Sequence, residues 1–345
     1  DGDVSADDGN PLTVPQLKDA YGQHLQNHVA YGTRRRTLSK LGHVVELFGD
    51  RRVTTLDADA LDEYITHRMK AKVKPLTING ELSSIRAMLN WAVETKRISD
   101  SPVAKYPMVK TDEPDPFLFK KDIERIIANE KLSAKKAAKL SRERMILAPE
   151  DIDRLIQLAR KKAPDLVLPL MLVSTTGMRR SELVKLLKSD FDPDLGRLLV
   201  RSGKGSWTKK TKRTVDVHES VLSLLRAHHR SLAERQSLLF PIFDIPNSKR
   251  SKKSEVPIED RRADRASRLL DDLLDESQFK LPGGWHTLRH SFITICVWKG
   301  YSFEQISQWS GHIHPDTQKR YTHYYGEASK KLMDGLPFAF SEGEE

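Results

Sequence analysis

Residues 283–292 read GGWHTLRHSF and place two histidines and an arginine within about one turn of a predicted helix. Side chains three apart on a helix share a face, so His286 and Arg289 point toward one location. His290 lies one residue further round, while the apolar residues that follow, up to Cys296, are expected to face inward. One end of this helix can therefore offer an imidazole and a guanidinium to a single anion.

A zinc site is the competing interpretation of the same turn, because His286 and His290 are four residues apart. The glutamate of the zinc-protease motif is missing, however. A guanidinium inside the turn would also repel a metal ion. The pattern favours an anion site, and it predicts no metal and no cofactor.

The charge of the chain points to a polyanionic partner, since the net charge over 345 residues is +10. Residues 201–213 hold six basic residues and no acidic one, and residues 248–253 form a second basic cluster. One such run is usually a solvated loop, but several runs on a basic chain favour nucleic acid. The single cysteine can form no internal disulfide, and no apolar run reaches membrane length, so a cytoplasmic location is expected.

Apolar residues at helical spacing predict a small all-helical domain over residues 11–105, after a disordered tail at 1–10. Four helices are expected, with Thr13 capping the first and Asp57 the third; they cover residues 13–30, 34–48, 57–70 and 76–95. Basic residues fall at the helix ends and linkers, where phosphates are commonly met. The candidate DNA contacts here are Arg34, Arg35, Arg36, Lys72 and Lys74.

The rest of the chain predicts a basic junction and a second, mostly helical domain with one hairpin. Residues 106–145 read as a linker followed by amphipathic helices, residues 146–335 as the second domain, and residues 336–345 as a tail. A long basic turn joins RLLVR at 197–201 to RTVDV at 213–217, as in a β-hairpin. Ser302 and Gln305 form a capping box. Further helices are expected at residues 151–162, 166–177, 219–235, 260–276, 286–299, 302–309 and 316–332, with a short one within 178–191.

Five segments of the second domain carry candidate chemistry: TTGMRRSEL with Arg179 and Glu182, the lysines of the hairpin turn, WHTLRH, SGH with His312, and QKRYTHYY with Tyr321. Each alone has an ordinary structural explanation. Together, the arginines and histidines can neutralise the oxygens of a phosphodiester. A tyrosine can attack phosphorus, and a lysine can protonate the departing hydroxyl. Such chemistry needs neither metal nor ATP.

This ordered set of Arg, Lys, His-x-x-Arg, His and Tyr resembles the tyrosine recombinases, the phage integrase family. The resemblance spans nearly the whole chain and is strongest in TGMRRSEL, HTLRH, GH and RYTH. It implies an α+β fold, mostly α with a small hairpin or sheet. An N-terminal helical core-binding (SAM-like) domain would precede a tyrosine-recombinase catalytic domain. The junction at 106–145 and the stretch at 245–280 are longer than in many members. Beside the helices expected in each, the added length is expected to be surface loop with phosphate contacts.

The resemblance also implies roles for single residues. Arg179 and Arg289 correspond to the arginines that clamp the phosphate. His286 and His312 correspond to the two active-site histidines, and Tyr321 corresponds to the nucleophile.

Other residues of the second domain take secondary roles by the same resemblance. Glu182 and His290 are expected to support the site, while Tyr324 and Tyr325 have the wrong spacing from His312 and should pack. The lysine stays open between Lys204, which is preferred, and Lys210. The basic run at 201–213, and not the resemblance, marks three further hairpin residues as expected DNA contacts: Lys209, Lys212 and Arg213.

The implied activity is site-specific recombination or integration of DNA, for example of a mobile element. Duplex DNA would be cut and rejoined through a 3′-phosphotyrosyl intermediate and a Holliday junction, without metal or ATP. A homotetramer would act on paired sites in the nucleoid, with DNA-bending proteins as candidate accessory partners and no membrane. Two alternatives remain open: a DNA-relaxing enzyme of the type IB topoisomerase kind, and an inactive DNA-binding relative.

Overall fold

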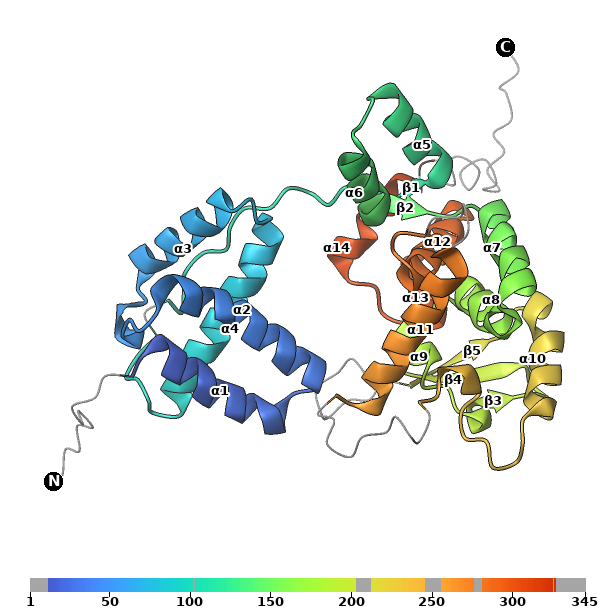
Figure 1. Ribbon diagram of the computed structural model, residues 1–345, viewed down its shortest axis with the longest axis horizontal. Helices are drawn as coiled ribbons and strands as arrows, with labels where there is room; N and C mark the ends of the chain where they lie inside the picture. The colour runs from blue at the N-terminus through green and yellow to red at the C-terminus, as the bar shows by residue number, and fades with distance from the viewer. Residues whose placement is uncertain are drawn as a thin grey trace, which may run out of the picture. The chain divides into compact units, whose positions relative to one another are not determined.

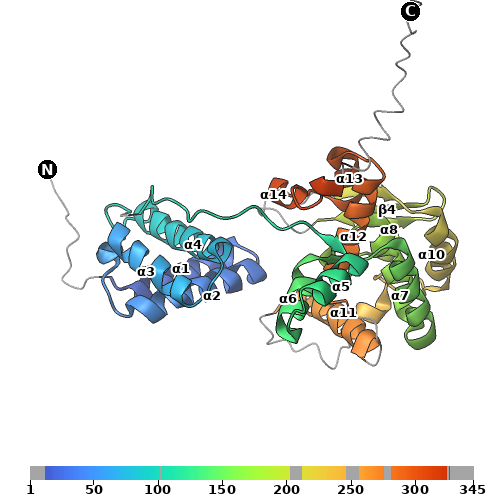
Figure 2. The same cartoon turned by 90° about the horizontal axis from the view of Figure 1, so that it is seen from above.

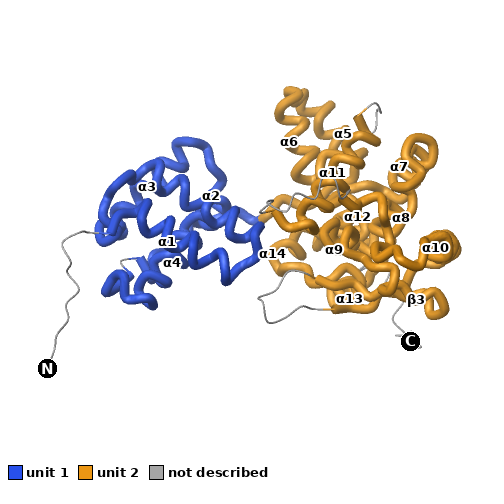
Figure 3. Tube along the Cα trace, turned by 60° about the horizontal axis from the view of Figure 1, so that its bottom comes forward, with its two compact units in different colours: residues 1–113 blue, residues 114–345 orange. Residues whose placement is uncertain are grey.

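The computed structural model describes residues 12–101, 103–202, 212–245, 256–275, 281–324 and 326. The chain divides into two compact units, residues 1–113 and 114–345, coloured separately in Figure 3. Each unit has its own apolar core. Among the described residues, no helix is both long and apolar enough to cross a membrane.

Unit 1 contains the four predicted helices, each within a few residues of its expected bounds. They are α1 (Val14–His28), α2 (Tyr31–Phe48), α3 (Ala58–Lys70) and α4 (Pro75–Glu94), with a 3-10 turn at Val53–Thr55. The Asp57 cap is confirmed, because Asp57 Oδ1 accepts from the Ala60 amide at 2.9 Å. Thr13 occupies the N-cap position of α1, but its side chain makes no cap hydrogen bond, and Gln16 Oε1 accepts from the Thr13 amide at 3.0 Å. Helix α4 contacts the other three helices and supplies much of the core.

A buried polar group ties α3 to α4. Glu81, on α4, is only 1% exposed and accepts from Arg68 Nη2 at 2.6 Å and Arg68 Nε at 2.9 Å. Tyr64 Oη also donates to Glu81 Oε2, at 2.9 Å. The carboxylate is therefore paired and hydrogen-bonded, the condition under which a charge is tolerated in a core.

Unit 2 begins earlier than the sequence predicts, because part of the expected junction folds onto it. Strand β1 (Leu118–Phe119) pairs in parallel with β2 (Met145–Ile146), and the amphipathic helices α5 (Lys120–Asn129) and α6 (Ala134–Arg144) connect them. Parallel pairing requires such a crossover. The predicted helices are thus present, but they belong to unit 2 rather than to a linker.

Two helices organise the core of unit 2. Helix α8 (Val167–Thr176) is apolar on all sides, and it contacts α7 (Pro149–Lys162), α10 (Glu219–Ser231) and α12 (Trp285–Trp298). Helix α12 carries the HTLRH segment and packs against α8, α13 (Phe303–Ser310) and β2. Figures 1 and 2 show α12 among these elements. The remaining helices are α9 (Arg180–Leu183), α11 (Ile258–Asp275) and α14 (Pro315–Gln318).

The predicted hairpin is confirmed, with β4 (Arg197–Arg201) antiparallel to β5 (Lys212–Asp216). A short strand that the sequence did not predict, β3 (Phe191–Asp192), adds to β4 and completes a three-stranded sheet. Leu198 and Val215 are paired and buried on its inner face.

The helix predicted over residues 316–332 is not continuous in its described part. It stops after α14, and Tyr321 N donates to Gln318 O at 2.9 Å, an i to i−3 bond. A 3-10 turn follows at Thr322–Tyr324. At this turn Arg320 and Tyr321 both contact the first residues of unit 2, Asp115 and Phe117.

Candidate active site

Arg179 and Glu182 meet at a turn that a glycine makes feasible. Helix α8 ends at Gly177, whose φ of +63° is left-handed. A Cβ at Gly177 would lie 2.4 Å from Phe292 Cδ1 of α12, so no larger residue fits. Arg179 caps α9, and its amide donates to Glu182 Oε2 at 2.9 Å while its Nη1 donates to Oε1 at 3.2 Å.

Arg213 completes this cluster, although it was expected to contact DNA from the hairpin. Its Nη2 and Nη1 donate to Glu182 Oε2 at 2.8 Å and Oε1 at 3.1 Å, and its Nε donates to Trp309 O at 2.8 Å. Because this fork is occupied, Arg213 positions Glu182 from within the site. Strand periodicity could have revealed this, since Arg213 and the buried Val215 share a face of β5.

Arg289 lies deeper, held by main-chain oxygens. Its side chain is 6% exposed, and Nη1 donates to Gly177 O at 2.6 Å and to Ser310 O, while Nη2 reaches Gly311 O at 3.4 Å. Burial first, and then the charge of Arg179, lower the pKa of Arg289 to about 10. The guanidinium therefore remains charged at neutral pH.

Gly311 allows the 310–312 loop to approach the arginines. Its φ is +76°, and a Cβ there would lie 2.9 Å from Arg213 Nη1 and 3.2 Å from Arg179 Nη1. Arg179 Nη2 donates to the carbonyl of the next residue, His312, at 2.7 Å. The loop and the arginines thus fix each other.

The cluster carries more positive than negative charge. Three guanidinium groups, those of Arg179, Arg213 and Arg289, surround the single carboxylate of Glu182. Burial alone would raise the pKa of Glu182, but the hydrogen bonds and charges of Arg213 and Arg179 hold it below its usual value. The excess charge suits an anion such as a phosphodiester. The His286 and His312 side chains, expected to face that anion, are exposed.

Tyr321 is fully buried, at 0% exposure. Its hydroxyl lies 2.6 Å from His290 Nδ1, and its ring packs against Phe117 at 5.0 Å and Phe303 at 6.3 Å between centroids. Burial raises the pKa of Tyr321 above its usual value. The hydroxyl is therefore protonated, and it donates to His290 in the tautomer whose Nδ1 carries no proton.

His290 supports the tyrosine rather than the arginine cluster. Its ring stacks on Phe117 at 4.3 Å. Burial first, and then the charges of His286 and Arg289, lower the pKa of His290 to about 3, so the imidazole is neutral. A neutral ring can accept the hydrogen bond from Tyr321.

Of the other predicted residues of unit 2, the structure describes Tyr324 and Lys212. Tyr324 packs, as expected, at 7% exposure, with its hydroxyl donating to Phe117 O at 3.3 Å. Lys212 is exposed at the start of β5. Lys204, Lys209, Lys210 and Tyr325 lie outside the described residues. Within the described ranges, no three His, Cys, Asp or Glu side chains gather as a metal site would require.

The DNA contacts predicted in unit 1 lie where α2, α3 and α4 begin or end. Arg35 and Arg36 are exposed in the first turns of α2, and Arg34 is partly buried with its guanidinium 6.0 Å from the Tyr31 ring. Lys72 follows α3 with a φ of +59°, and Lys74 caps α4. Both lysines are exposed.

Comparison with known families identifies both units. The sequence profile of the phage integrase family matches residues 145–327, more than half of the chain, and the profile of the phage integrase N-terminal domain matches residues 13–110. The chain belongs to the phage integrase family. It is therefore a tyrosine recombinase, an enzyme of DNA recombination.

Individual relatives agree with this assignment. The chain is 25% identical over 278 residues to tyrosine recombinase XerC of Chlorobaculum parvum, covering 79% of this chain and 76% of that protein. It is 26% identical over 189 residues to tyrosine recombinase XerA of Pyrococcus furiosus, covering 54% and 60%.

Solved structures share the fold. The Tn1549 transposon integrase, determined with circular intermediate DNA, matches with a TM-score of 0.61 at 16% identity, over 94% of this chain and 99% of that one. Lambda integrase, determined as a tetramer on a Holliday junction, matches with a TM-score of 0.59 at 16% identity, over 90% and 78%.

Proposed function

We propose that this recombinase binds duplex DNA and transfers its strands through Tyr321. The observation that carries the proposal is the arginine cluster: Arg179 and Arg289 present excess positive charge beside Glu182. The Tyr321 hydroxyl lies 2.6 Å from Nδ1 of His290, the residue next to Arg289 on α12. In this assignment Arg179 and Arg289 hold the scissile phosphate. His286 and His312 contact its oxygens from the rim.

The reaction exchanges one phosphodiester for another. The Tyr321 hydroxyl oxygen forms a bond to phosphorus, the bond from phosphorus to the 5′ oxygen breaks, and the phenolic proton passes to solvent water. The departing 5′ oxygen takes a proton from a hairpin lysine, Lys204 or Lys210. The 5′-hydroxyl of a partner strand then attacks the 3′-phosphotyrosyl link and restores the tyrosine. The bond count is unchanged, so no energy source enters the scheme.

Strand exchange between two sites needs more than one active site. We assign a homotetramer on paired DNA sites with a Holliday junction between the two exchanges, supported by the resemblance to lambda integrase, which was solved in that form. Arg34, Arg35, Arg36, Lys72 and Lys74 would contact the phosphates from unit 1. The protein would act on DNA in the cytoplasm, at the nucleoid.

The covalent intermediate tests this function directly. Wild-type protein, Tyr321→Phe and Tyr324→Phe are incubated with labelled DNA from the regions flanking the gene, without ATP or added metal. Denaturing gels should show protein-linked DNA for wild type and for Tyr324→Phe, which keeps the ring and loses a hydroxyl that donates to Phe117 O. Tyr321→Phe should bind DNA and form no adduct. An adduct of undiminished yield in Tyr321→Phe would refute the assignment of the nucleophile.

A further inference from the structure

The nucleophile assigned above is closed off in this structure. Tyr321 is fully buried, and its hydroxyl is hydrogen-bonded to His290. A buried, hydrogen-bonded hydroxyl cannot reach a phosphate at the arginine cluster without leaving this position. The contacts that hold it there come from the segment through which the chain enters unit 2.

We propose that residues 115–119, here called the lock segment, and Arg320 form a lock that holds Tyr321 in a resting position until DNA is engaged. The proposal rests on the role of Tyr321 as the nucleophile. It assigns Phe117 and Arg320 as positioning residues that act through Tyr321 and touch no substrate.

Arg320 is the main connection between the lock segment and the nucleophile. Its Nε donates to Asp115 O at 2.8 Å and its Nη2 to Glu143 O at 2.6 Å. The guanidinium carbon also lies 3.7 Å from the centroid of the Phe117 ring. Because Arg320 is the residue next to Tyr321, these contacts fix the backbone on which the nucleophile sits.

Phe117 closes the same position from the other side. Its ring stacks on His290 at 4.3 Å and lies 5.0 Å from Tyr321, so it covers both partners of the buried hydrogen bond. Its amide donates to Arg320 O at 3.1 Å, and its carbonyl accepts from Tyr324 Oη at 3.3 Å. Phe117 therefore holds residues on both sides of Tyr321 along the chain.

His290 restrains the tyrosine without activating it. A pKa of about 3 leaves the imidazole a poor acceptor of the phenolic proton, while burial raises the pKa of Tyr321 itself. The hydrogen bond thus stabilises the protonated, inactive tyrosine. Release of Tyr321 from the lock is the step that makes it available.

The lock segment lies where a movement of unit 1 would first reach unit 2 along the chain. It directly follows unit 1, which ends at residue 113, and Pro114 and Pro116 restrict its backbone. Val109 is bound to Asn79 of unit 1 through its amide and its carbonyl, and Asp115 O accepts from Arg320, so only residues 110–114 separate an anchor in unit 1 from the lock. A displacement at the end of unit 1 that exceeds the slack of these five residues therefore reaches Phe117. DNA binding by unit 1 is the natural source of such a displacement.

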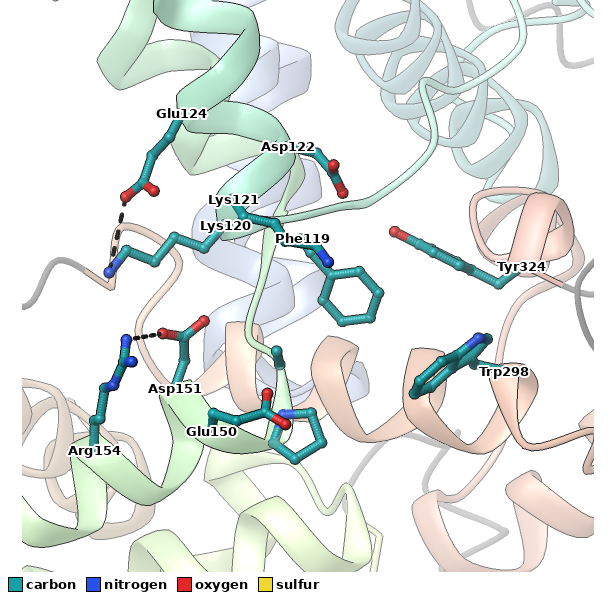
Figure 4. Close-up of a pocket in the computed structure, with 12 residues that line it drawn as sticks. Phe119, Lys120, Lys121, Asp122, Glu124, Glu150, Asp151, Arg154, Trp298 and Tyr324 are labelled. Carbon is teal, nitrogen blue, oxygen red and sulfur yellow. Dashed lines mark hydrogen bonds and ion pairs between the residues drawn. The ribbon is translucent and has the colours of Figure 1, made fainter.

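Space beside the lock makes movement feasible. A cavity of about 640 Å³ borders it, lined in part by Phe119, Trp298 and Tyr324 (Figure 4). Tyr324 and Phe119 meet edge to face with centroids 5.3 Å apart. An interior packed at full density would resist rearrangement, whereas these rings have open volume next to them.

Chemical modification of the free protein tests the lock without any need for catalysis. Tetranitromethane nitrates accessible tyrosines, and peptide mass spectrometry reports each site. In wild type, Tyr321 should react as slowly as Tyr64, which is also 0% exposed, and far more slowly than Tyr301, which is 43% exposed. Arg320→Met should raise the Tyr321 rate by about ten- to thirtyfold, the factor that corresponds to two lost hydrogen bonds of ordinary net strength.

Two further variants make the comparison specific. Arg226→Met removes a matched arginine of unit 2 that donates to Pro193 O and Asp194 O, and it should leave Tyr321 protected. Phe117→Leu keeps an apolar side chain and should also expose Tyr321, so it replaces Arg320→Met if that variant unfolds. The single thiol, Cys296, is buried in the same apolar cluster and should stay unreactive in every folded variant.

Adduct formation on flanking DNA separates the lock from the proposed function. If Tyr321 stays protected in both lock variants while wild type forms the adduct, the lock is wrong and the function stands. If Tyr321 becomes reactive in the lock variants and no protein forms an adduct, the lock stands and the function is wrong. The expected result is exposure in both lock variants together with faster adduct formation than in wild type.

Discussion

Removing the charge of Glu182 should destabilise unit 2 more than any conservative change on its surface. The carboxylate is buried, with 2% of its side chain exposed, and it accepts from the Arg179 amide and from both arginine side chains. Glu182→Gln leaves these guanidinium groups without an anion. Breaking a buried pair by removing one partner costs about 3–5 kcal/mol. For a domain of this size the loss corresponds to a fall in melting temperature of roughly 6–20 °C.

Scanning calorimetry at neutral pH measures this effect, with Asp216→Asn as the matched control. Asp216 pairs with Arg197 at 2.8 Å on β5, but the two side chains are 71% and 52% exposed, so its loss should change stability by less than about 1 kcal/mol. Equal melting temperatures for the two variants would refute the argument that the buried carboxylate holds the cluster together.

The same variant has a defined pH dependence. The folded-state pKa of Glu182 lies below its ordinary value, so the carboxylate stabilises the fold fully above about pH 4.5. As the pH falls through the lower, folded-state pKa, wild type loses this contribution. The gap between wild type and Glu182→Gln should therefore close in acid. A gap that stays constant down to low pH would mean that lost packing, rather than lost charge, explains the variant.

Two more substitutions follow from the geometry. Gly311→Ala places a Cβ 2.9 Å from Arg213 Nη1 at a left-handed φ, so it should destabilise unit 2 by about 1–3 kcal/mol and lower the adduct yield. Gly49→Ala is the control, because Gly49 has a similar φ but a Cβ there would meet no atom within 4 Å, and it should leave the adduct intact. Equal loss of adduct in both variants would contradict this role of Gly311. The neutral His290, with a pKa of about 3, should make the melting temperature of unit 2 fall as the pH drops below about 6.5, because the unfolded chain binds the proton more readily. His290→Gln should flatten that slope between pH 7 and 5 while His312→Gln, at an exposed position, should not; identical slopes in all three proteins would rule His290 out as the cause.

Much of the fold could be predicted from local sequence patterns. Helix caps such as Asp57 and Ser302 depend only on residues within one turn, and the structure has both bonds. The hairpin also follows from local alternation. The start of unit 2 does not, because β1 and β2 are two-residue strands that pair with each other across the intervening helices α5 and α6.

The site divides in the same way. Arg179 and Glu182 interact within one helical turn, and the sequence anticipated their association. The buried resting position of Tyr321 depends on Phe117, some two hundred residues earlier in the chain, and no periodicity near Tyr321 encodes that contact. Arg213 was assigned to DNA from the charge of its neighbours, whereas its direction on β5 decides its partner.

The main-chain cradle of Arg289 has a consequence for mutational robustness. Every residue type supplies a carbonyl oxygen, so no point substitution can delete the hydrogen-bond acceptors of this buried cation, as one could for an arginine paired with a carboxylate. The hydrogen bonds of Arg289 are instead sensitive to changes in the backbone conformation that positions those carbonyl oxygens. Gly177 and Gly311 supply two of these carbonyl oxygens and have no room for a side chain, so substitutions there should displace the acceptors of Arg289.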